Sequence, residues 1–162
     1  MKFRLRVSVA AISLALAASV GTEAFAAGEH HHDHGTAAPA KLHLNAGKKW
    51  ETDNTLRQAM EEINQSMAKA LPAIHKDRFG DPEYAAVAAS IEQKVAFAVE
   101  HCKLAPEADA MLHIVIADLM GGAEVMNGKT DSSRHDGAVR VLQALQSYGK
   151  YFQHPGWKVA KG

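Results

Sequence analysis

Cysteine is the scarcest chemically reactive residue of this 162-residue chain, which contains only Cys102. A single cysteine cannot form a disulfide within the chain, so Cys102 is buried, bound to a ligand or paired with another chain. Covalent attachment of haem needs two cysteines two residues apart, followed by histidine. Here His101 precedes Cys102 and there is no second cysteine, which excludes a c-type cytochrome.

The chain also has no excess of charge, because 18 basic residues balance 18 acidic ones. Removal of the predicted targeting segment takes away three basic residues and Glu23, which leaves 15 basic and 17 acidic residues. A net charge of −2 argues against nucleic acid or an anionic membrane surface as a partner.

The first 26 residues have the pattern of a signal peptide. Three basic residues precede the uncharged apolar run Val7–Val20, which is too short to span a bilayer comfortably. Ala24 and Ala26 then provide small residues at the two positions that a signal peptidase reads. We expect cleavage after Ala26 and a periplasmic protein of 136 residues, enough for one domain with one core.

Residues 27–49 are predicted to be a disordered, histidine-rich leader, because they have too little apolar surface to offset the entropy of ordering. Six consecutive positions, 29–34, contain four imidazoles and two carboxylates. Imidazole suits copper, nickel and zinc, and copper has the highest intrinsic affinity. The predicted metal ligands are His30, His31, His32 and His34. The alternatives are a solubilising leader without a ligand and a remnant of a purification tag.

Residues 50–162 are predicted to be a helical domain. Apolar residues recur at steps of three and four, which predicts helices over about 53–74, 82–102, 106–126 and 133–153. Asp81 is expected to cap the second helix, and Pro72 to bend or end the first. Short connections between helices of similar length favour an all-α, up-down-up-down four-helix bundle.

Antiparallel neighbours in such a bundle would place certain residues at the same level. One predicted layer contains Met60, Val95, His113 and Tyr148. The end layer contains Trp50, Asp53, Cys102, Glu107 and Phe152, with two more histidines nearby. The possible metal ligands within the bundle are Met60, His101, Cys102, His113 and His154. Packing is the alternative for Cys102 and the methionines, and a hydrogen-bonded core histidine is the alternative for His113.

Three motifs are similar to segments of short exported bacterial proteins labelled DnrO-like. They are Trp50-Glu51-Thr52-Asp53 with Leu56-Arg57 and Met60, Cys102 to Asp109 with Leu112-His113, and His154-Pro155-Gly156-Trp157. This resemblance covers most of the mature chain and implies a periplasmic helical protein without a known reaction. The architecture also resembles periplasmic four-helix-bundle cytochromes. A b-type haem would need only two axial ligands on facing helices, such as Met60 and His113.

No set of residues predicts an enzyme. The sequence contains no serine in a nucleophile-elbow motif and no Gly-rich phosphate loop after a strand. The Glu-x-x-His pair that is typical of di-iron bundles occurs only at Glu29–His32, in the leader. The sequence therefore predicts a periplasmic, non-enzymatic protein that binds or sequesters a transition metal, with copper favoured. The alternatives are a b-type haem electron carrier and a structural or stress-related protein without a cofactor. The oligomeric state stays open.

Overall fold

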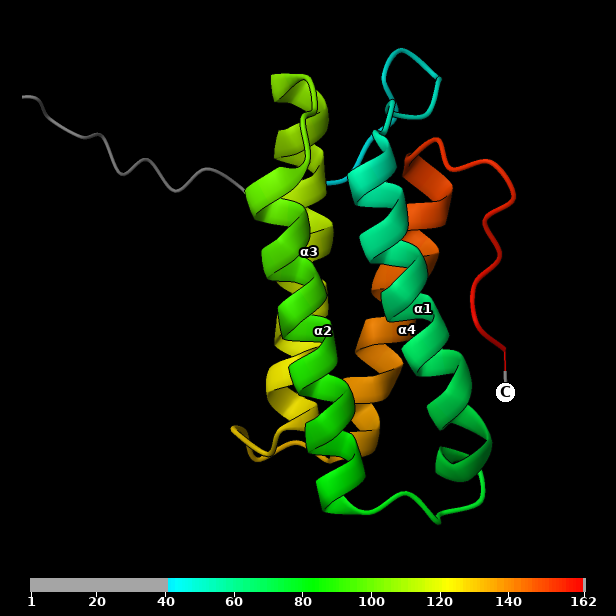
Figure 1. Ribbon diagram of the computed structural model, residues 1–162, viewed down its shortest axis with the longest axis vertical. Coiled ribbons are helices and arrows are strands. Elements are labelled where there is room, and N and C mark those ends of the chain that lie inside the picture. The colour runs from blue at the N-terminus through cyan, green and yellow to red at the C-terminus, as the bar shows by residue number, and fades with distance from the viewer. Residues whose placement is uncertain (1–40, 162) are drawn as a thin grey trace, which may run out of the picture. The chain divides into compact units, whose positions relative to one another are not determined.

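The computed structural model describes residues 41–161, and this part of the chain contains four α-helices and no named strand (Figure 1). The helices are α1 (Asn54–Ile74), α2 (Asp81–His101), α3 (Pro106–Met126) and α4 (Arg134–Tyr151). The prediction of an all-α domain with four helices is confirmed for these residues. The predicted signal peptide and the four leader histidines lie outside the described residues. None of the described helices is long and apolar enough to cross a bilayer.

Side chains and prolines set the helix starts close to the predicted positions. The Asp53 carboxylate accepts a hydrogen bond from the Leu56 amide at 2.7 Å, so Asp53 caps α1 as predicted. Ser133 caps α4 in the same way. The prediction for α2 is wrong by one residue, because the cap is Gly80 and Asp81 is already helical. Asp81 still favours the positive helix end, where an acidic residue is stabilising.

Pro72 does not end α1, which continues to Ile74. Proline in a helix removes one main-chain hydrogen bond and crowds the preceding turn. Because Pro72 lies in the last turn, little helix follows it, and the chain leaves the helix at His75. The helix thus ends at Ile74, where the apolar periodicity predicts, and of the two outcomes expected at Pro72 the early end does not occur.

The four helices enclose one apolar core. Helix α1 packs on α2, α2 on α3 and α3 on α4, whereas the contact between α1 and α4 is sparser than these three (Figure 1). Helices α3 and α4 approach closely at Gly122 and Gly137, where a Cβ on Gly137 would lie 2.7 Å from the Gly122 carbonyl oxygen. The largest fully buried side chains are Tyr148, Phe152, Leu56, Met60, Ile63, Met67, Leu71, Ile91, Leu112, Leu119, Met126 and Leu145.

Residues 41–49 have a defined path. The prediction that the disordered leader extends to residue 49 is therefore wrong for these nine residues. Asn45 and Lys48 exchange main-chain hydrogen bonds of 2.8 and 2.9 Å around a tight turn. The indole Nε1 of Trp50 donates to the His43 carbonyl at 2.7 Å. Trp50 also pairs with Phe152 through a parallel β-bridge. A buried tryptophan thus fixes this segment on the end of the bundle, which the polarity of the segment alone does not indicate.

Candidate functional site

The predicted bundle ligands come from three different helices and from the segment after α4, and the structure does not gather them. Met60 is buried in the core at 2 % exposure. His113 is exposed on α3, and its Nδ1 lies 2.9 Å from the Asp109 carbonyl oxygen. His113 therefore does not face the core, because Leu112 and Val115 occupy the core face of that turn. Met60 and His113 do not form the facing pair that axial haem ligation would need.

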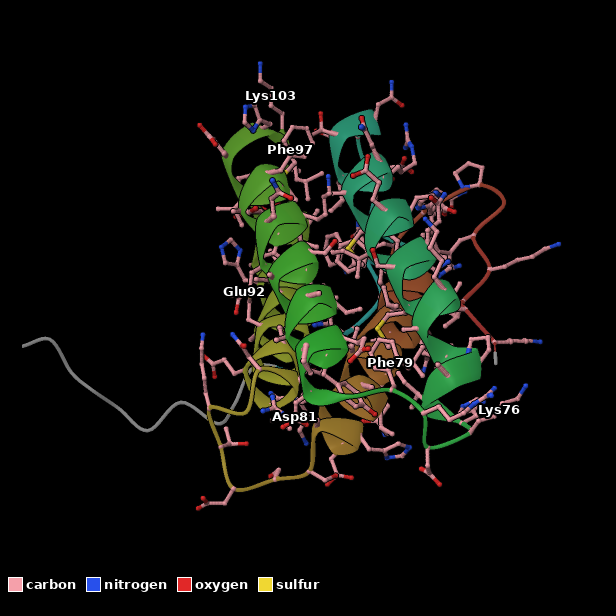
Figure 2. All side chains as sticks on the ribbon, turned by 60° about the horizontal axis from the view of Figure 1, so that its bottom comes forward. Lys76, Phe79, Asp81, Glu92, Phe97 and Lys103 are labelled. Carbon is pink, nitrogen blue, oxygen red and sulfur yellow. The ribbon has the colours of Figure 1, made fainter. Side chains whose placement is uncertain are left out.

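The end of α2 carries His101 and Cys102, and the two side chains differ in environment. Figure 2 shows Phe97 and Lys103 at this end of the molecule. The exposed His101 ring stacks on Phe97 with centroids 4.8 Å apart, and its Nδ1 lies 3.1 Å from the Phe97 carbonyl oxygen. Cys102, which follows α2, is half-buried.

The surroundings of Cys102 favour the neutral thiol. Burial raises the pKa of the Cys102 thiol, and the carboxylates of Asp53 and Asp109 raise it further. A thiolate is the form that binds metals and attacks electrophiles, so a raised pKa lowers the reactivity of this cysteine. Asp53 is held close by a 2.6 Å hydrogen bond that its Oδ2 accepts from the Lys103 amide. This contact brings the start of α1 to the end of α2, as the predicted end layer requires.

An aromatic cluster with one internal hydrogen bond lies where α4 ends and the C-terminal segment begins. The Tyr148 hydroxyl lies 3.0 Å from His154 Nδ1, and Tyr148 is fully buried. The rings of both residues contact Trp157, each with a centroid separation of 4.9 Å. The ring of Phe152 stacks on that of Tyr148, with centroids 5.4 Å apart. The cluster joins the last turn of α4 to the segment that follows it.

Burial controls both ionisable groups of this cluster. It raises the pKa of the Tyr148 phenol and lowers the pKa of the half-buried His154 imidazole. The Glu61 carboxylate raises the pKa of His154, and the Arg57 guanidinium lowers it. At neutral pH both groups are therefore uncharged, and a phenol that donates to a neutral imidazole satisfies both. The hydrogen bond between Tyr148 and His154 therefore joins α4 to the segment after it, and neither side chain carries a charge.

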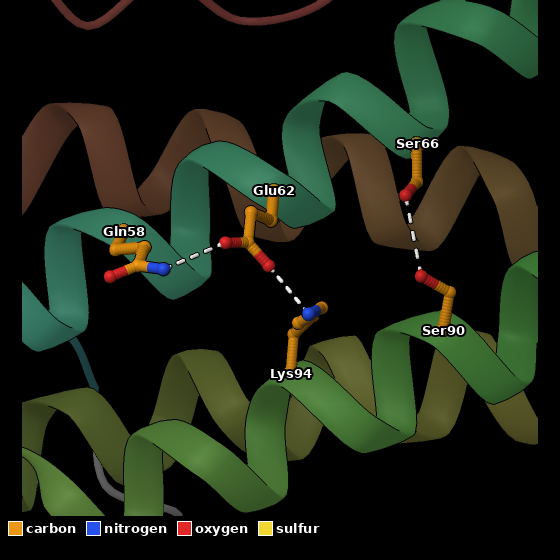
Figure 3. Close-up of polar contacts among 5 residues, drawn as sticks. All are labelled: Gln58, Glu62, Ser66, Ser90 and Lys94. Atoms are coloured by element: carbon orange, nitrogen blue, oxygen red, sulfur yellow. Dashed lines mark hydrogen bonds and ion pairs between the residues drawn. The ribbon is translucent and has the colours of Figure 1, made fainter.

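The α1–α2 surface has a second group of polar contacts (Figure 3). Glu62 accepts a hydrogen bond from Gln58 at 2.9 Å and forms a 2.6 Å ion pair with Lys94. These two donors lower the pKa of the Glu62 carboxyl. The hydroxyls of Ser66 and Ser90 lie 3.4 Å apart farther along the same pair of helices. All five side chains are exposed or half-buried, so these contacts join two helices and create no enclosed site.

Within residues 41–161, no three His, Cys, Asp or Glu side chains lie close enough together to hold a metal ion. His101, Cys102, His113 and His154 thus belong to no such group of three in this part of the protein. The four leader histidines lie outside it, and their metal-binding role stays a prediction.

Sequence reasoning missed one residue that organises the C-terminal segment, Asn64. It is the only buried polar or charged residue within 41–161, with 6 % exposure. The pattern contained a usable signal, because Asn64 lies four residues after Met60 and three before Met67, on the core side of α1. A polar residue at such a position needs hydrogen-bond partners, and Asn64 finds them in the main chain of residues 158–160.

No family model matches the chain, and neither the curated proteins nor the solved structures include one with significant similarity to it. The resemblance to DnrO-like exported proteins and to periplasmic cytochromes therefore stays a prediction from the sequence motifs.

Proposed function

We propose that this is an exported, non-enzymatic protein that binds a transition-metal ion through its N-terminal histidines. The observation that carries the proposal is the density of ligands, with four imidazoles and two carboxylates within residues 29–34. A short segment of this composition can supply several nitrogen ligands to one ion without a preformed cavity. Copper is the favoured ion by intrinsic affinity, and zinc and nickel follow.

The distribution of the other histidines supports a site in the N-terminal segment. Six of the ten histidines of the chain lie beyond residue 40, at positions 43, 75, 101, 113, 135 and 154. Five of these are exposed at separate positions along the described chain, and His154 is engaged with Tyr148. A helical body that offers only isolated imidazoles binds a divalent ion weakly compared with clustered ones.

We also infer an up-down-up-down order for the helices. Connections of four to seven residues join consecutive helices, and such short connections favour antiparallel neighbours. Two contacts support this order. Asp53, before α1, accepts from Lys103, after α2, and Arg134 at the start of α4 forms a 2.9 Å ion pair with Asp81 at the start of α2. The bundle then serves as a stable periplasmic body for the metal-binding segment.

Isothermal titration of the mature chain with Cu(II) and Zn(II) tests the metal proposal. The test variant replaces His30, His31, His32 and His34 by glutamine. The matched control replaces His75, His101, His113 and His135, which are all exposed in the described part of the chain. We expect the first variant to lose at least tenfold in Cu(II) affinity and the control to bind as the parent chain does.

Equal loss in both quadruple variants would refute a site in the N-terminal segment. An absorbance spectrum of the protein as purified from the periplasm distinguishes metal binding from the alternative function, electron transfer by a b-type haem. A Soret band would support the b-type haem electron carrier, whereas bound copper without that band would support the metal-binding proposal. Recovery of the protein from the cytoplasm with its first 26 residues intact would refute export.

A further inference from the structure

His43 is the described histidine that follows the four leader histidines most closely along the chain. Only residues 35–42 separate it from His34, whereas α1 and the rest of α2 lie between His43 and His101. A chain extends by at most about 3.3–3.6 Å per residue, so the nine steps from His34 to His43 span at most ~30 Å. An ion held by the leader histidines is therefore always within reach of the start of the described chain.

A buried indole fixes the main chain at His43. Trp50 is 7 % exposed, and its Nε1 donates to the His43 carbonyl at 2.7 Å. The main chain of Trp50 is bonded in turn to the Tyr151 carbonyl and to the Gln153 amide, both at 2.8 Å. Leu42 packs against the core, and Figure 1 shows this segment in cyan, looping over the end of the bundle where α1 begins and α4 ends. His43 is thus held in place before any ion binds.

The imidazole of His43 has the arrangement of a metal-binding imidazole. Its Nδ1 lies 3.2 Å from the Lys41 carbonyl oxygen, which can only accept, so Nδ1 carries the hydrogen. The neutral ring then has its lone pair on Nε2. Ligating histidines almost always donate their other ring N–H to a carbonyl, a carboxylate or water, which fixes the ring and raises its basicity as a ligand. The side chain is exposed, and the ring makes no other hydrogen bond within residues 41–161.

Two other exposed histidines share the Nδ1 contact but not the position in the chain. His101 Nδ1 lies 3.1 Å from the Phe97 carbonyl oxygen, and its ring stacks on that phenyl ring. His113 Nδ1 lies 2.9 Å from the Asp109 carbonyl oxygen and 3.5 Å from the carboxylate of the same residue. Both are on helices, far along the chain from the leader. His101 therefore offers a control that matches His43 in local geometry and differs in its connection to the leader.

We propose that His43 is a further ligand of the ion that the four leader histidines bind, so that the ion joins the leader to the end of the bundle. This inference rests on the proposed function and adds a fixed ligand to it. A ligand whose main chain is already ordered contributes affinity at a lower entropic cost than one that must be ordered on binding. The bound ion would lie beside Trp50, whose ring centroid is 5.9 Å from that of His43.

Isothermal titration of the mature chain with Cu(II) tests this ligand. The substitution His43→Gln removes the imidazole but keeps the carbonyl that accepts from Trp50. We expect the Cu(II) affinity to fall at least fivefold at unchanged stoichiometry, whereas His101→Gln should bind as the parent chain does. Circular dichroism establishes that the helices of both variants are intact. Equal affinity of the His43→Gln protein and the parent chain would overturn the assignment, and so would equal losses in the two variants.

The indole N–H of Trp50 reports where the ion lies. Zn(II) is diamagnetic, so ¹H–¹⁵N spectra of the mature chain stay sharp when it binds. We expect saturating Zn(II) to shift the Trp50 indole cross-peak at least threefold more than that of Trp157, the other tryptophan of the chain, and the Trp157→Phe protein assigns the two peaks. The shift should disappear in the His43→Gln protein. A Trp50 cross-peak that Zn(II) does not move would refute a site at His43.

The variant with glutamine at all four leader histidines separates failure of this inference from failure of the proposed function. We expect it to need at least tenfold more Zn(II) for the Trp50 shift. Parent-like Cu(II) affinity in this variant would refute the leader site itself. Weakened binding there, together with parent-like binding by His43→Gln, would keep the leader site and refute only the role of His43. A Trp50 shift at the parent's Zn(II) concentration would show that His43 binds without the leader, which contradicts a joint site.

Discussion

Replacement of Asn64 by alanine should destabilise the protein by releasing residues 153–161, a segment that follows α4 and that we call the strap. The Asn64 side chain is 6 % exposed and makes two hydrogen bonds, of 2.9 and 2.8 Å, to strap main-chain atoms. Loss of a typical intramolecular hydrogen bond costs about 1 kcal/mol, or about 2 kcal/mol when its freed partner stays buried, and Asn64 makes two such bonds. If the strap stays seated, Asn64→Ala should therefore lower the free energy of unfolding by about 2–4 kcal/mol.

Release of the strap limits this loss, because water then satisfies the freed Lys158 carbonyl and Ala160 amide. The strap would keep only its contacts at Trp157 and Val159, and we expect the indole emission to shift toward that of exposed tryptophan. Urea unfolding followed by circular dichroism measures the free energy, and tryptophan fluorescence follows the strap. For a urea m-value of about 1–3 kcal/mol/M, the midpoint should fall by ~1 M or more.

Gln93→Ala is the control, because its side chain is exposed on α2 and such substitutions usually change stability by less than about 0.5 kcal/mol. A change for Asn64→Ala that is as small as the control's, with unaltered fluorescence, would refute the role of this side chain in holding the strap.

Three further predictions concern a titration, a thiol and the N-terminal segment. Burial lowers the pKa of His154 below the unfolded value of about 6.5, so its contribution to stability is present above that pH and is lost as the pH falls through the folded pKa. His154→Gln should therefore show a smaller loss of unfolding free energy between pH 7 and pH 5 than the parent chain, and the exposed His135→Gln should not. Cys102→Ala should cost roughly 1 kcal/mol in urea unfolding and leave the metal content unchanged, and thiol labelling that begins only after chelation would contradict a packing role. Removal of residues 27–40 should leave the melting temperature within about 2 °C, as calorimetry would measure, because the described core lies entirely in residues 50–152, and a larger fall would contradict an independent bundle.

The helical periodicity of the sequence determined the secondary structure of the described chain. The stripe that steps from Leu56 to Ile74 is buried at every predicted position, and Pro106 begins α3 as expected. Capping residues such as Asp53 and Ser133 act through hydrogen bonds to amides three residues away, so their effect is local and readable from the sequence. The absence of a second cysteine likewise excluded an internal disulfide and a c-type haem without reference to any fold.

Only the tertiary structure decided which side chains meet. His113 and Leu112 are adjacent in the sequence, but one faces solvent and the other the core, because a rotation of about 100° per residue separates their directions. A sequence estimate of layers cannot resolve such a rotation when helix ends are uncertain by two to four residues.

The partners of Asn64 and Tyr148 depend on the path of the chain after α4. Asn64 meets residues 158 and 160 across more than ninety positions, whereas Tyr148 meets His154 because the chain turns back at Pro155-Gly156. The sequence Pro155-Gly156 predicts a turn, but it does not determine the direction in which the chain continues after it. Packing of Trp50 and Trp157 against the core favours the observed direction, because the apolar area that each indole removes from water depends on the surface of the folded bundle.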